Sequence, residues 1–419
     1  MYNLFPRHFR RIEEWIGVLD HAAKMGFNLL FVNPFHQTGF SGSLYAVKDY
    51  YKLNPLFLAP GSDPCDWSPL EEFIEQCGKR DIRVVMDLVI NHTAIDSVLI
   101  EQHPDWYLRD EKGKVKSPYA IDPGDASKVT IWGDLAEIDT LNSPDRQSLW
   151  KYFDDLVAFF QEMGIYTYRC DAAYQVPAEL WSYLISRAKR RNAETRFLAE
   201  TLGCRLEEIE ALADAGFDYL FNSSKWWNFD EPWALEQHEA NGRIAPSFSF
   251  PESHDTQRLA EESGGKLSEQ KARYLFAALF SEGLLMPMGY EYGARNRMDV
   301  VKGTPEDAKE TIAWNLTDWI SQINAIKKST PVLKEEGHWE TIGTLEQNPV
   351  FLRKSSDNGA ASVIIGINKQ DNPWELHSND VPDEVKGKKM IRPFHDPQTV
   401  ETMTGPIALT DREIVVWFE

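Results

Sequence analysis

The sequence predicts an α/β fold: a (β/α)8 TIM barrel with a small lobe inserted after strand 3 and a C-terminal antiparallel β domain. Three observations lead to this prediction. Short apolar runs alternate with amphipathic stretches through roughly the first 330 of the 419 residues, which indicates parallel strands with helices between them. One segment between two apolar runs is too long for an ordinary loop, and the end of the chain changes to short β-like runs with turns.

Eight apolar runs have the length and composition of strands. They lie at 2–5, 28–35, 82–90, 165–171, 196–200, 217–222, 245–255 and 283–291. Helical patterns separate them at 12–25, 68–79, 146–163, 178–190, 205–214, 267–281 and 312–328. Eight strand–helix units are the number that closes a TIM barrel.

The two interruptions of this pattern define the expected domains. The segment 92–143 contains the turn-rich "HPDWYLRDEKGKV" and is expected to form a lobe over one face of the barrel. Runs such as "ASVIIGINK" and "REIVVWFE" are typical of short antiparallel strands. We therefore expect a catalytic barrel over 1–91 and 144–330, an inserted lobe over 92–143, and a C-terminal β-sandwich over 331–419.

Composition narrows the class of partner. A net charge of −21 argues against nucleic acid and anionic membranes, which attract basic surfaces, but it does not oppose a neutral ligand such as a sugar. The 14 tryptophans suit core packing or flat platforms for ring-shaped ligands. The four cysteines show no zinc-ligand spacing, and the sequence shows neither an apolar leader nor a membrane-length apolar run. We expect a cytoplasmic protein with reduced thiols, either a monomer or a small homo-oligomer.

Polar residues recur at the ends of four predicted strands. Because active sites of TIM barrels lie at the carboxyl ends of the strands, these side chains are candidates for one shared site. A single strand-end acid is often only a solvated or capping residue, but four strands ending in acids at one rim favour a functional site. The candidates are Asp87, Asn91 and His92 after strand 3, Arg169 and Asp171 at strand 4, Glu200 after strand 5, and His254 and Asp255 after strand 7.

Several carboxylates in one cleft suit glycoside cleavage. That reaction uses one carboxylate as nucleophile or base and one carboxylic acid as proton donor. The competing interpretation is a Mg²⁺ or Ca²⁺ site, because carboxylates also bind these cations. Arg169 lies two residues before Asp171 on the same predicted strand, so both side chains point to the same side. A guanidinium there keeps Asp171 ionised and repels a metal ion.

These segments resemble the motifs of the α-amylase family of retaining glycosidases and transglycosidases. "DLVINH", "YRCDAA", "FLAE" and "PESHD" are similar to its four motifs and occur in the family's order. "SLYAVKDYYKLNP" (43–55) resembles the stretch after strand 2, and "DLAEIDTLN" (134–142) the stretch that closes the inserted lobe. The lobe around "HPDWYLRDEKGKV" is similar to the branch of maltosyltransferases that use maltose 1-phosphate.

The resemblance implies a role for each matching residue. Asp171 is expected to be the nucleophile that forms a covalent β-glycosyl aspartate, Glu200 the general acid/base, and Asp255 the stabiliser of the transition state. Ala172 and Ala173 would be small so that a sugar ring can approach. The expected substrate-binding residues are Tyr45 (stacking on the sugar), His92 and His254 (hydrogen bonds to it), Arg169 (holding Asp171) and Asp87 (orienting Arg169).

One departure from the family concerns calcium. Many members read Lys-His where this chain reads Tyr174-Gln175, and the carbonyl of that histidine often binds calcium together with an asparagine that matches Asn91. The lobe acids are Asp96, Asp122, Asp125 and Asp134, and they form no dense ligand cluster along the sequence. We therefore expect no required cofactor and no metal site, with Ca²⁺ as an alternative that the sequence does not favour.

The sequence thus predicts a retaining glycosidase that acts on α-1,4-linked glucans or maltooligosaccharides. The alternative within the family is a transglycosidase, either a glucanotransferase or a maltosyltransferase that uses maltose 1-phosphate. Two other classes stay open: an amylase-like binding protein without catalysis, and a metal-dependent barrel enzyme. Trp226, Trp227 and Trp233, which follow strand 6, are interpreted either as an acceptor wall or as packing against the barrel.

Overall fold

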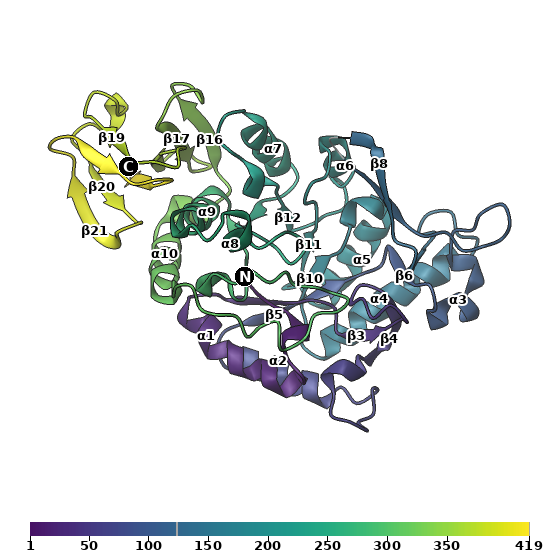
Figure 1. Cartoon of the computed structure of the whole chain (residues 1–419). Coiled ribbons are helices and arrows are strands. Elements are labelled where there is room, and N and C mark those ends of the chain that lie inside the picture. Colours follow the sequence, from purple (N-terminus) through teal and green to yellow (C-terminus); the bar gives the residue numbers. More distant parts are fainter. Residues whose placement is uncertain (123–124, 419) are drawn as a thin grey trace. The chain divides into compact units, whose positions relative to one another are not determined.

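The computed structural model describes residues 1–122 and 125–418, and describes side chains outside 120–126. The fold is an α/β barrel with an inserted lobe and C-terminal antiparallel sheets, as the sequence predicts (Figure 1). The strands of the barrel sheet are β1 (Tyr2–Leu4), β2 (Leu29–Val32), β5 (Arg83–Leu88), β10 (Thr167–Cys170), β11 (Arg196–Ala199), β12 (Tyr219–Phe221), β13 (Ser247–Ser249), β14 (Gly283–Leu284) and β15 (Met286–Pro287). Each of the eight predicted runs contains a strand, and the eighth run contains two short ones.

The chain divides into two compact units. The first comprises 1–23, 27–221 and 298–309, and the second comprises 24–26, 222–297 and 310–419. The second unit therefore combines the last barrel strands with the C-terminal sheets, and the predicted domain limits at 92–143 and 331–419 stay predictions.

In the first unit, the barrel strands form consecutive parallel pairs: β1 with β2, β2 with β5, β5 with β10, β10 with β11, and β11 with β12. Arg169 on β10 is in register with Asp87 on β5 and with Leu198 on β11. Because parallel strands end at the same edge, residues that follow β5, β10 and β11 meet there. The apolar runs form this layer because both faces of a parallel sheet are buried.

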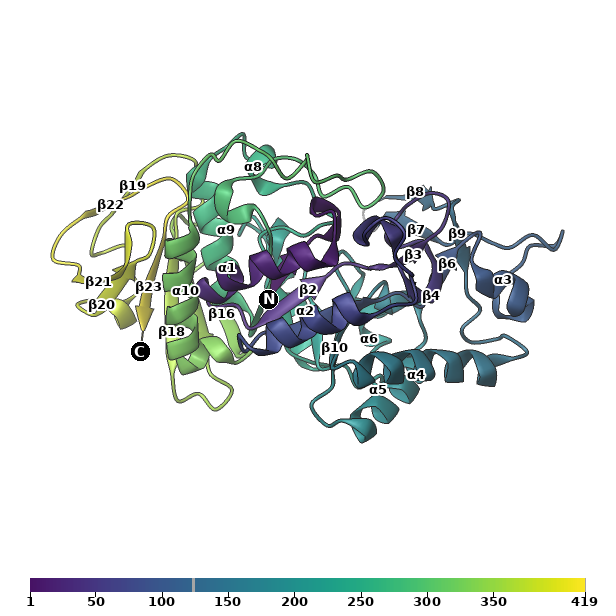
Figure 2. The ribbon, with the colours of Figure 1, turned by 90° about the horizontal axis from the view of Figure 1, so that it is seen from below.

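Helices follow the strands of the first unit. They are α1 (Leu19–Lys24), α2 (Ser68–Gly78), α4 (Arg146–Glu162), α5 (Ala178–Arg191) and α6 (Leu206–Glu210). Figures 1 and 2 show α4 and α5 side by side. Leu149, Phe153, Leu156 and Phe160 are buried on one face of α4, the spacing expected of an amphipathic helix.

Three predicted helices differ from those observed, and the one expected at 312–328 begins only at Thr317. The stretch 12–25 begins as a 3-10 helix, Ile12–Val18, before α1 starts. Gly17 within that stretch has low helix propensity. The stretch 205–214 is α-helical only over α6, because the Leu212 amide donates to the Ile209 carbonyl and tightens the following turn to three-residue spacing.

The inserted lobe follows β5 in the first unit. Its elements are β6 (His92–Ala94), α3 (Val98–Gln102), β7 (Tyr119–Asp122), β8 (Asp125–Ile131) and β9 (Leu135–Glu137). Antiparallel pairing of β6 with β9 places His92 opposite Glu137 and closes the lobe. A second small hairpin joins β3 (His36–Thr38) to β4 (Val47–Leu53) and presents Tyr45 from the loop between them.

The second unit carries the remaining regular elements. Its helices are α7 (Trp233–Gly242), α8 (Leu259–Glu262), α9 (Leu267–Phe280) and α10 (Thr317–Ser329). One antiparallel sheet has the order β16-β17-β18-β23-β20-β21, and a two-stranded sheet joins β19 to β22. These strands are β16 (His338–Ile342), β17 (Val350–Ser355), β18 (Ser362–Ile367), β19 (Trp374–Leu376), β20 (Lys389–Arg392), β21 (Asp396–Thr402), β22 (Ile407–Leu409) and β23 (Ile414–Phe418). Phe351, Ile364, Leu376, Leu409 and Trp417 form a buried core that joins both sheets.

Short 3-10 helices complete the described chain. They are η1 (Pro6–His8), η2 (Ile12–Val18), η3 (Pro55–Phe57), η4 (Pro104–Trp106), η5 (Ala173–Gln175), η6 (Ser224–Trp226), η7 (Tyr290–Tyr292), η8 (Pro331–Lys334) and η9 (Asp383–Val385). The four cysteines are free thiols. Within the described residues, no helix has the length and apolarity to cross a membrane. The cytoplasmic location expected from the sequence stays a prediction.

Candidate active site

Arg169 is the centre of a carboxylate cluster in the first unit. Its Nη1 donates to both carboxylate oxygens of Asp87, at 2.9 and 3.1 Å, and to Oδ1 of Asp171 at 2.6 Å. Its Nη2 lies 4.0 Å from Oε2 of Glu200. One guanidinium thus faces three carboxylates, and the cluster can stabilise positive charge that develops on a bound ligand.

Exposure divides these acids into two kinds. The Asp87 side chain is fully buried, whereas those of Asp171 and Glu200 are 13% and 16% exposed. Burial raises the pKa of Asp87 to about 7, against the opposing effect of the Arg169 charge. Asp171 and Glu200 are therefore the acids that a ligand can reach, and Asp87 can act only through the residues that it contacts, such as Arg169.

Glu200 is oriented by the main chain. Its Oε2 accepts a hydrogen bond from the Ala172 amide at 3.1 Å, and its Oε1 accepts one from the Leu202 amide at 3.1 Å. Ala172 has the left-handed conformation, with φ 43° and ψ 45°, which is rare for a residue with a side chain. This turn directly after Asp171 aims the Ala172 amide at Glu200, a structural reason for a small residue at this position.

Tyr45 joins the cluster from the loop before β4. Its hydroxyl donates to Oδ2 of Asp87 at 2.7 Å and accepts from Nδ2 of Asn33 at 3.0 Å. The centroid of its ring lies 5.9 Å from the Arg169 guanidinium carbon. Tyr45 is thereby fixed against the buried half of the cluster.

Asn33 is a site residue that the sequence analysis missed. It is fully buried, follows β2, and accepts at Oδ1 a hydrogen bond from Nδ2 of Asn3 at 2.9 Å. A polar residue directly after an apolar strand is the pattern that identified the candidate acids, and Asn33 shows the same pattern. It was missed because the predicted strand 28–35 includes position 33, whereas β2 ends at Val32.

His92 and Asn91 lie where β5 leads into the lobe. His92 is 6% exposed, and burial lowers the pKa of its imidazole. Nε2 of His92 has no hydrogen-bond partner within the described part of the chain, so it is available to a ligand atom. Nδ2 of Asn91 donates to Oε1 of Gln175 at 2.7 Å.

The Asn91–Gln175 hydrogen bond occupies the position at which the resemblance raised calcium. This bond uses only Nδ2 of Asn91, whereas a calcium ion would be bound by Oδ1 of an asparagine. No group of three or more acidic, histidine or cysteine side chains suited to a metal occurs among the described residues. The side chains of Asp122 and Asp125 lie outside those residues. The expectation that no metal is required, with Ca²⁺ as the alternative, stays a prediction.

His254 and Asp255 belong to the second unit and follow β13. Nε2 of His254 lies 3.1 Å from Oδ2 of Asp255, with side-chain exposures of 3% and 52%. Asp255 is the most exposed of the predicted catalytic acids, and the Arg297 guanidinium donates to its carbonyl at 3.5 Å. The structure thus brings Tyr45, Asp87, Arg169, Asp171 and Glu200 together in one unit and pairs His254 with Asp255 in the other.

Comparisons with known proteins find relatives of this chain in sequence and in fold. Residues 3–121 match the family model for the glucanotransferase domain of glycogen debranching enzyme. An α-1,4-glucan:maltose-1-phosphate maltosyltransferase of Burkholderia pseudomallei is 26% identical over 78% of this chain and 28% of its own length. The corresponding protein of Myxococcus xanthus is 24% identical over 87% of this chain and 58% of its own length. The chain therefore spans only part of these two relatives.

Solved structures show the same fold. The α-amylase from Lactobacillus plantarum superposes with a TM-score of 0.77 at 20% identity, covering 100% of this chain and 98% of that one. The chain thus has the fold of known α-amylases, and its sequence is similar to those of maltosyltransferases.

Proposed function

We propose that this chain acts on α-1,4-linked glucans or maltooligosaccharides as a retaining glycosidase, with Asp171 as nucleophile and Glu200 as general acid/base. The observation that carries the proposal is the pair of partly exposed carboxylates beside one buried guanidinium. Nη1 of Arg169 donates a hydrogen bond to Oδ1 of Asp171 at 2.6 Å, which holds the proposed nucleophile in a fixed orientation.

The proposed reaction has two steps. In the first, a carboxylate oxygen of Asp171 bonds to the anomeric carbon while the glycosidic C–O bond breaks and Glu200 gives its proton to the leaving oxygen. In the second, an acceptor hydroxyl attacks the same carbon, Glu200 takes its proton, and the bond to Asp171 breaks. Two inversions give net retention of the α configuration.

The remaining site residues bind and orient in this proposal. Asp87 and Tyr45 hold Arg169 from its buried side, and Nε2 of His92 is available to a sugar hydroxyl. Asp255 would bind sugar hydroxyls as the stabiliser of the transition state, with His254 beside it. The cluster's excess of carboxylates over cations suits the positive charge that develops on the sugar ring.

A second candidate is transfer of a maltosyl group from maltose 1-phosphate to a glucan. It is favoured by the sequence relatives, because the proteins of B. pseudomallei and M. xanthus are both named as maltosyltransferases with that donor. Hydrolysis and transfer share the covalent intermediate and differ in whether water or a sugar hydroxyl reaches it.

One set of incubations tests both candidates. Purified protein is given maltooligosaccharides alone, maltooligosaccharides with phosphate, or maltose 1-phosphate with a glucan acceptor, and products are separated by chain length. Hydrolysis yields shorter oligosaccharides in water alone, whereas maltosyl transfer yields phosphate and chains two glucose units longer. Asp171→Asn is the inactive control, and no turnover of any α-glucan by the parent protein would refute the proposal.

A further inference from the structure

Trp226 lies in the second unit and is half exposed. From the sequence, this tryptophan could either form an acceptor wall or pack against the barrel. Its side chain is 49% exposed, whereas the neighbouring Trp227 is fully buried against Phe229 and Phe276. Trp227 therefore packs on the barrel, as one interpretation held. Trp226 does not, and its indole is open to solvent.

Lys225 lies against the indole ring of Trp226. Its side chain is 2% exposed, and its ammonium lies over the Trp226 ring, 5.3 Å from the ring centroid. Burial lowers the pKa of Lys225, and the Glu262 carboxylate 3.7 Å away opposes that effect. Nζ makes no hydrogen bond to the described residues. A cation buried against one face of an indole leaves the other face as a fixed platform.

The platform borders a groove of about 360 Å³ in the second unit, a size within the range of small-ligand sites. Apart from Trp226, its lining is mainly charged side chains from α8, α9 and the C-terminal part of the unit. They are Lys225, Glu262, Lys266, Glu269, Arg273, Asp371 and Arg412. None of the predicted catalytic acids lines it.

Most of these charges are paired with a charge of opposite sign, and the four cations exceed the three carboxylates by one. Asp371 lies 3.0 Å from Lys266 and 2.8 Å from Arg412. Glu269 lies 2.8 Å from Arg273 and 3.3 Å from the same Arg412. An anionic ligand would have to compete with these carboxylates, and a cationic ligand with the guanidinium and ammonium groups. A neutral ligand rich in hydroxyls meets donors and acceptors without such competition.

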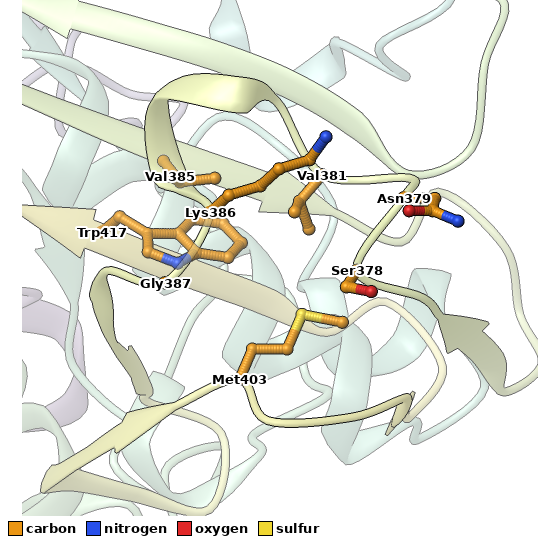
Figure 3. Close-up of a pocket in the computed structure, with 8 residues that line it drawn as sticks. All are labelled: Ser378, Asn379, Val381, Val385, Lys386, Gly387, Met403 and Trp417. Carbon is orange, nitrogen blue, oxygen red and sulfur yellow. The ribbon is translucent and has the colours of Figure 1, made fainter.

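A second tryptophan-lined pocket in the same unit gives the contrast. Figure 3 shows Trp417 with Val381, Val385 and Met403 in a pocket of about 180 Å³ among the C-terminal strands. Trp417 is 1% exposed and belongs to the buried core that joins the two sheets. That indole has no open face for a sugar ring, so the pocket is a gap at the edge of a core.

We propose that the groove beside Trp226 is a second carbohydrate-binding site, in which a segment of α-glucan stacks on the Trp226 indole and exchanges hydrogen bonds with the paired charges of the lining. The identity of the sugar as an α-glucan rests on the proposed function. Trp226 is the contact residue, and Lys225 is a positioning residue that fixes the indole.

Affinity electrophoresis in native gels containing glycogen tests the proposal. Retardation by the glucan should fall in Trp226→Ala, with an apparent dissociation constant larger by about tenfold, the equivalent of the roughly 1.4 kcal/mol that one stacked aromatic contact provides. Lys225→Met should weaken retardation less, and Lys225→Arg should restore part of it, because a guanidinium can also stack on the indole. Trp132→Ala, which removes another indole that is 38% exposed, is the matched control and should migrate like the parent.

Calorimetry separates this site from the catalytic cleft. In the Asp171→Asn background, which prevents turnover, maltoheptaose should occupy two sites per chain, and adding Trp226→Ala should leave one. One site in both proteins, or unchanged retardation of Trp226→Ala, would overturn the proposal. Absence of turnover of every α-glucan by the parent would refute the proposed function instead, and glycogen retardation that depends on Trp226 would still stand.

Discussion

Arg169 in the first unit and Arg258 in the second are both buried, and each lies beside a buried carboxylate. Nε of Arg258 lies 2.8 Å from Oε1 of Glu252, and both side chains are at most 1% exposed. Glu252 also accepts from the Leu259 amide, and Arg258 donates to the Met288 carbonyl at 3.0 Å. Both side chains are thus enclosed by protein, and a ligand cannot reach either of them.

The Arg169 cluster differs in one respect that decides its chemistry. Its guanidinium is shared between a buried acid, Asp87, and an acid that a ligand can reach, Asp171. A buried arginine–carboxylate pair is therefore not by itself a sign of catalysis, although Glu252 lies within the "PESHD" motif. A partly exposed acid held by the same guanidinium distinguishes the reactive cluster from the structural pair.

The largest expected effect is on activity in the first cluster. Asp171→Ala and Glu200→Gln should each lower kcat by roughly 10³-fold or more, because each removes one participant of a two-step covalent mechanism. Both variants should keep the melting temperature within a few degrees of the parent, since both side chains are partly exposed. If both variants kept activity within tenfold of the parent, the Arg169 cluster would not be catalytic and would not differ in role from the Arg258 pair.

Breaking the pair of Arg258 and Glu252 should lower the stability of the protein and not its activity. Arg258→Met leaves the carboxylate of Glu252 buried without its cation, which should lower the free energy of unfolding by about 3–5 kcal/mol. The fraction that stays folded should retain kcat/KM within about tenfold of the parent. Denaturant unfolding and initial rates measured on the same preparations check both parts. A loss of activity as large as that of Asp171→Ala at unchanged stability would contradict a structural role.

A smaller effect on stability is expected from His36, a buried ionisable group without an ion-pair partner among the described residues. It should appear as a dependence of the unfolding free energy on pH. His36 is 1% exposed among aromatic rings, its Nδ1 has no partner within the described residues, and burial lowers its pKa from 6.5 to about 4. The unfolded chain binds a proton at His36 below about pH 6.5, and the folded chain does so only below about pH 4. The stability that this neutral histidine contributes is therefore present above pH 6.5 and lost as pH falls through that window.

The variant His36→Phe lacks this titration. The difference in unfolding free energy between the parent and His36→Phe should change by about 3 kcal/mol between pH 7 and pH 4, in the direction that weakens the parent in acid. Urea unfolding of both proteins at several pH values measures it. Parallel pH profiles would mean that the imidazole is protonated in the folded state.

The smallest expected effect is that of metal removal. The described residues provide no cluster of metal-binding side chains, so EDTA should change neither activity nor melting temperature appreciably. A fall of several degrees on chelation, reversed by Ca²⁺, would show that a metal stabilises the native state.

Much of this fold was predictable because hydrophobic patterning fixes the strands and their alternation with helices. Arg169 and Asp171 were expected on one side of a strand from their spacing alone, and the register of β10 with β5 then brings Asp87 to Arg169. Asp171 and Glu200 could be proposed together because parallel strands share one edge. The separation of β14 from β15 was not predictable, since both lie within one continuous apolar run.

What the sequence did not reveal depends on side chains that meet only in three dimensions. The bond between Asn91 and Gln175 joins residues 84 positions apart, and no local pattern specifies it. Lys225 is a similar case, because a lysine in a polar stretch is ordinarily exposed, and its burial beneath Trp226 depends on how α8 and η6 pack. The sequence also does not reveal that Trp227 is buried whereas its neighbour Trp226 is exposed.

The central claim is that Asp171 forms a covalent bond to the sugar, and trapping that intermediate tests it most directly. A fluorinated glucosyl donor with a good leaving group, given to the Glu200→Gln variant, should slow hydrolysis of the intermediate enough for mass spectrometry of digested protein. The account predicts one added glycosyl group on the peptide that contains Asp171, and none when Asp171→Asn is introduced. A label on any other residue, or turnover with inversion and no covalent adduct, would contradict it.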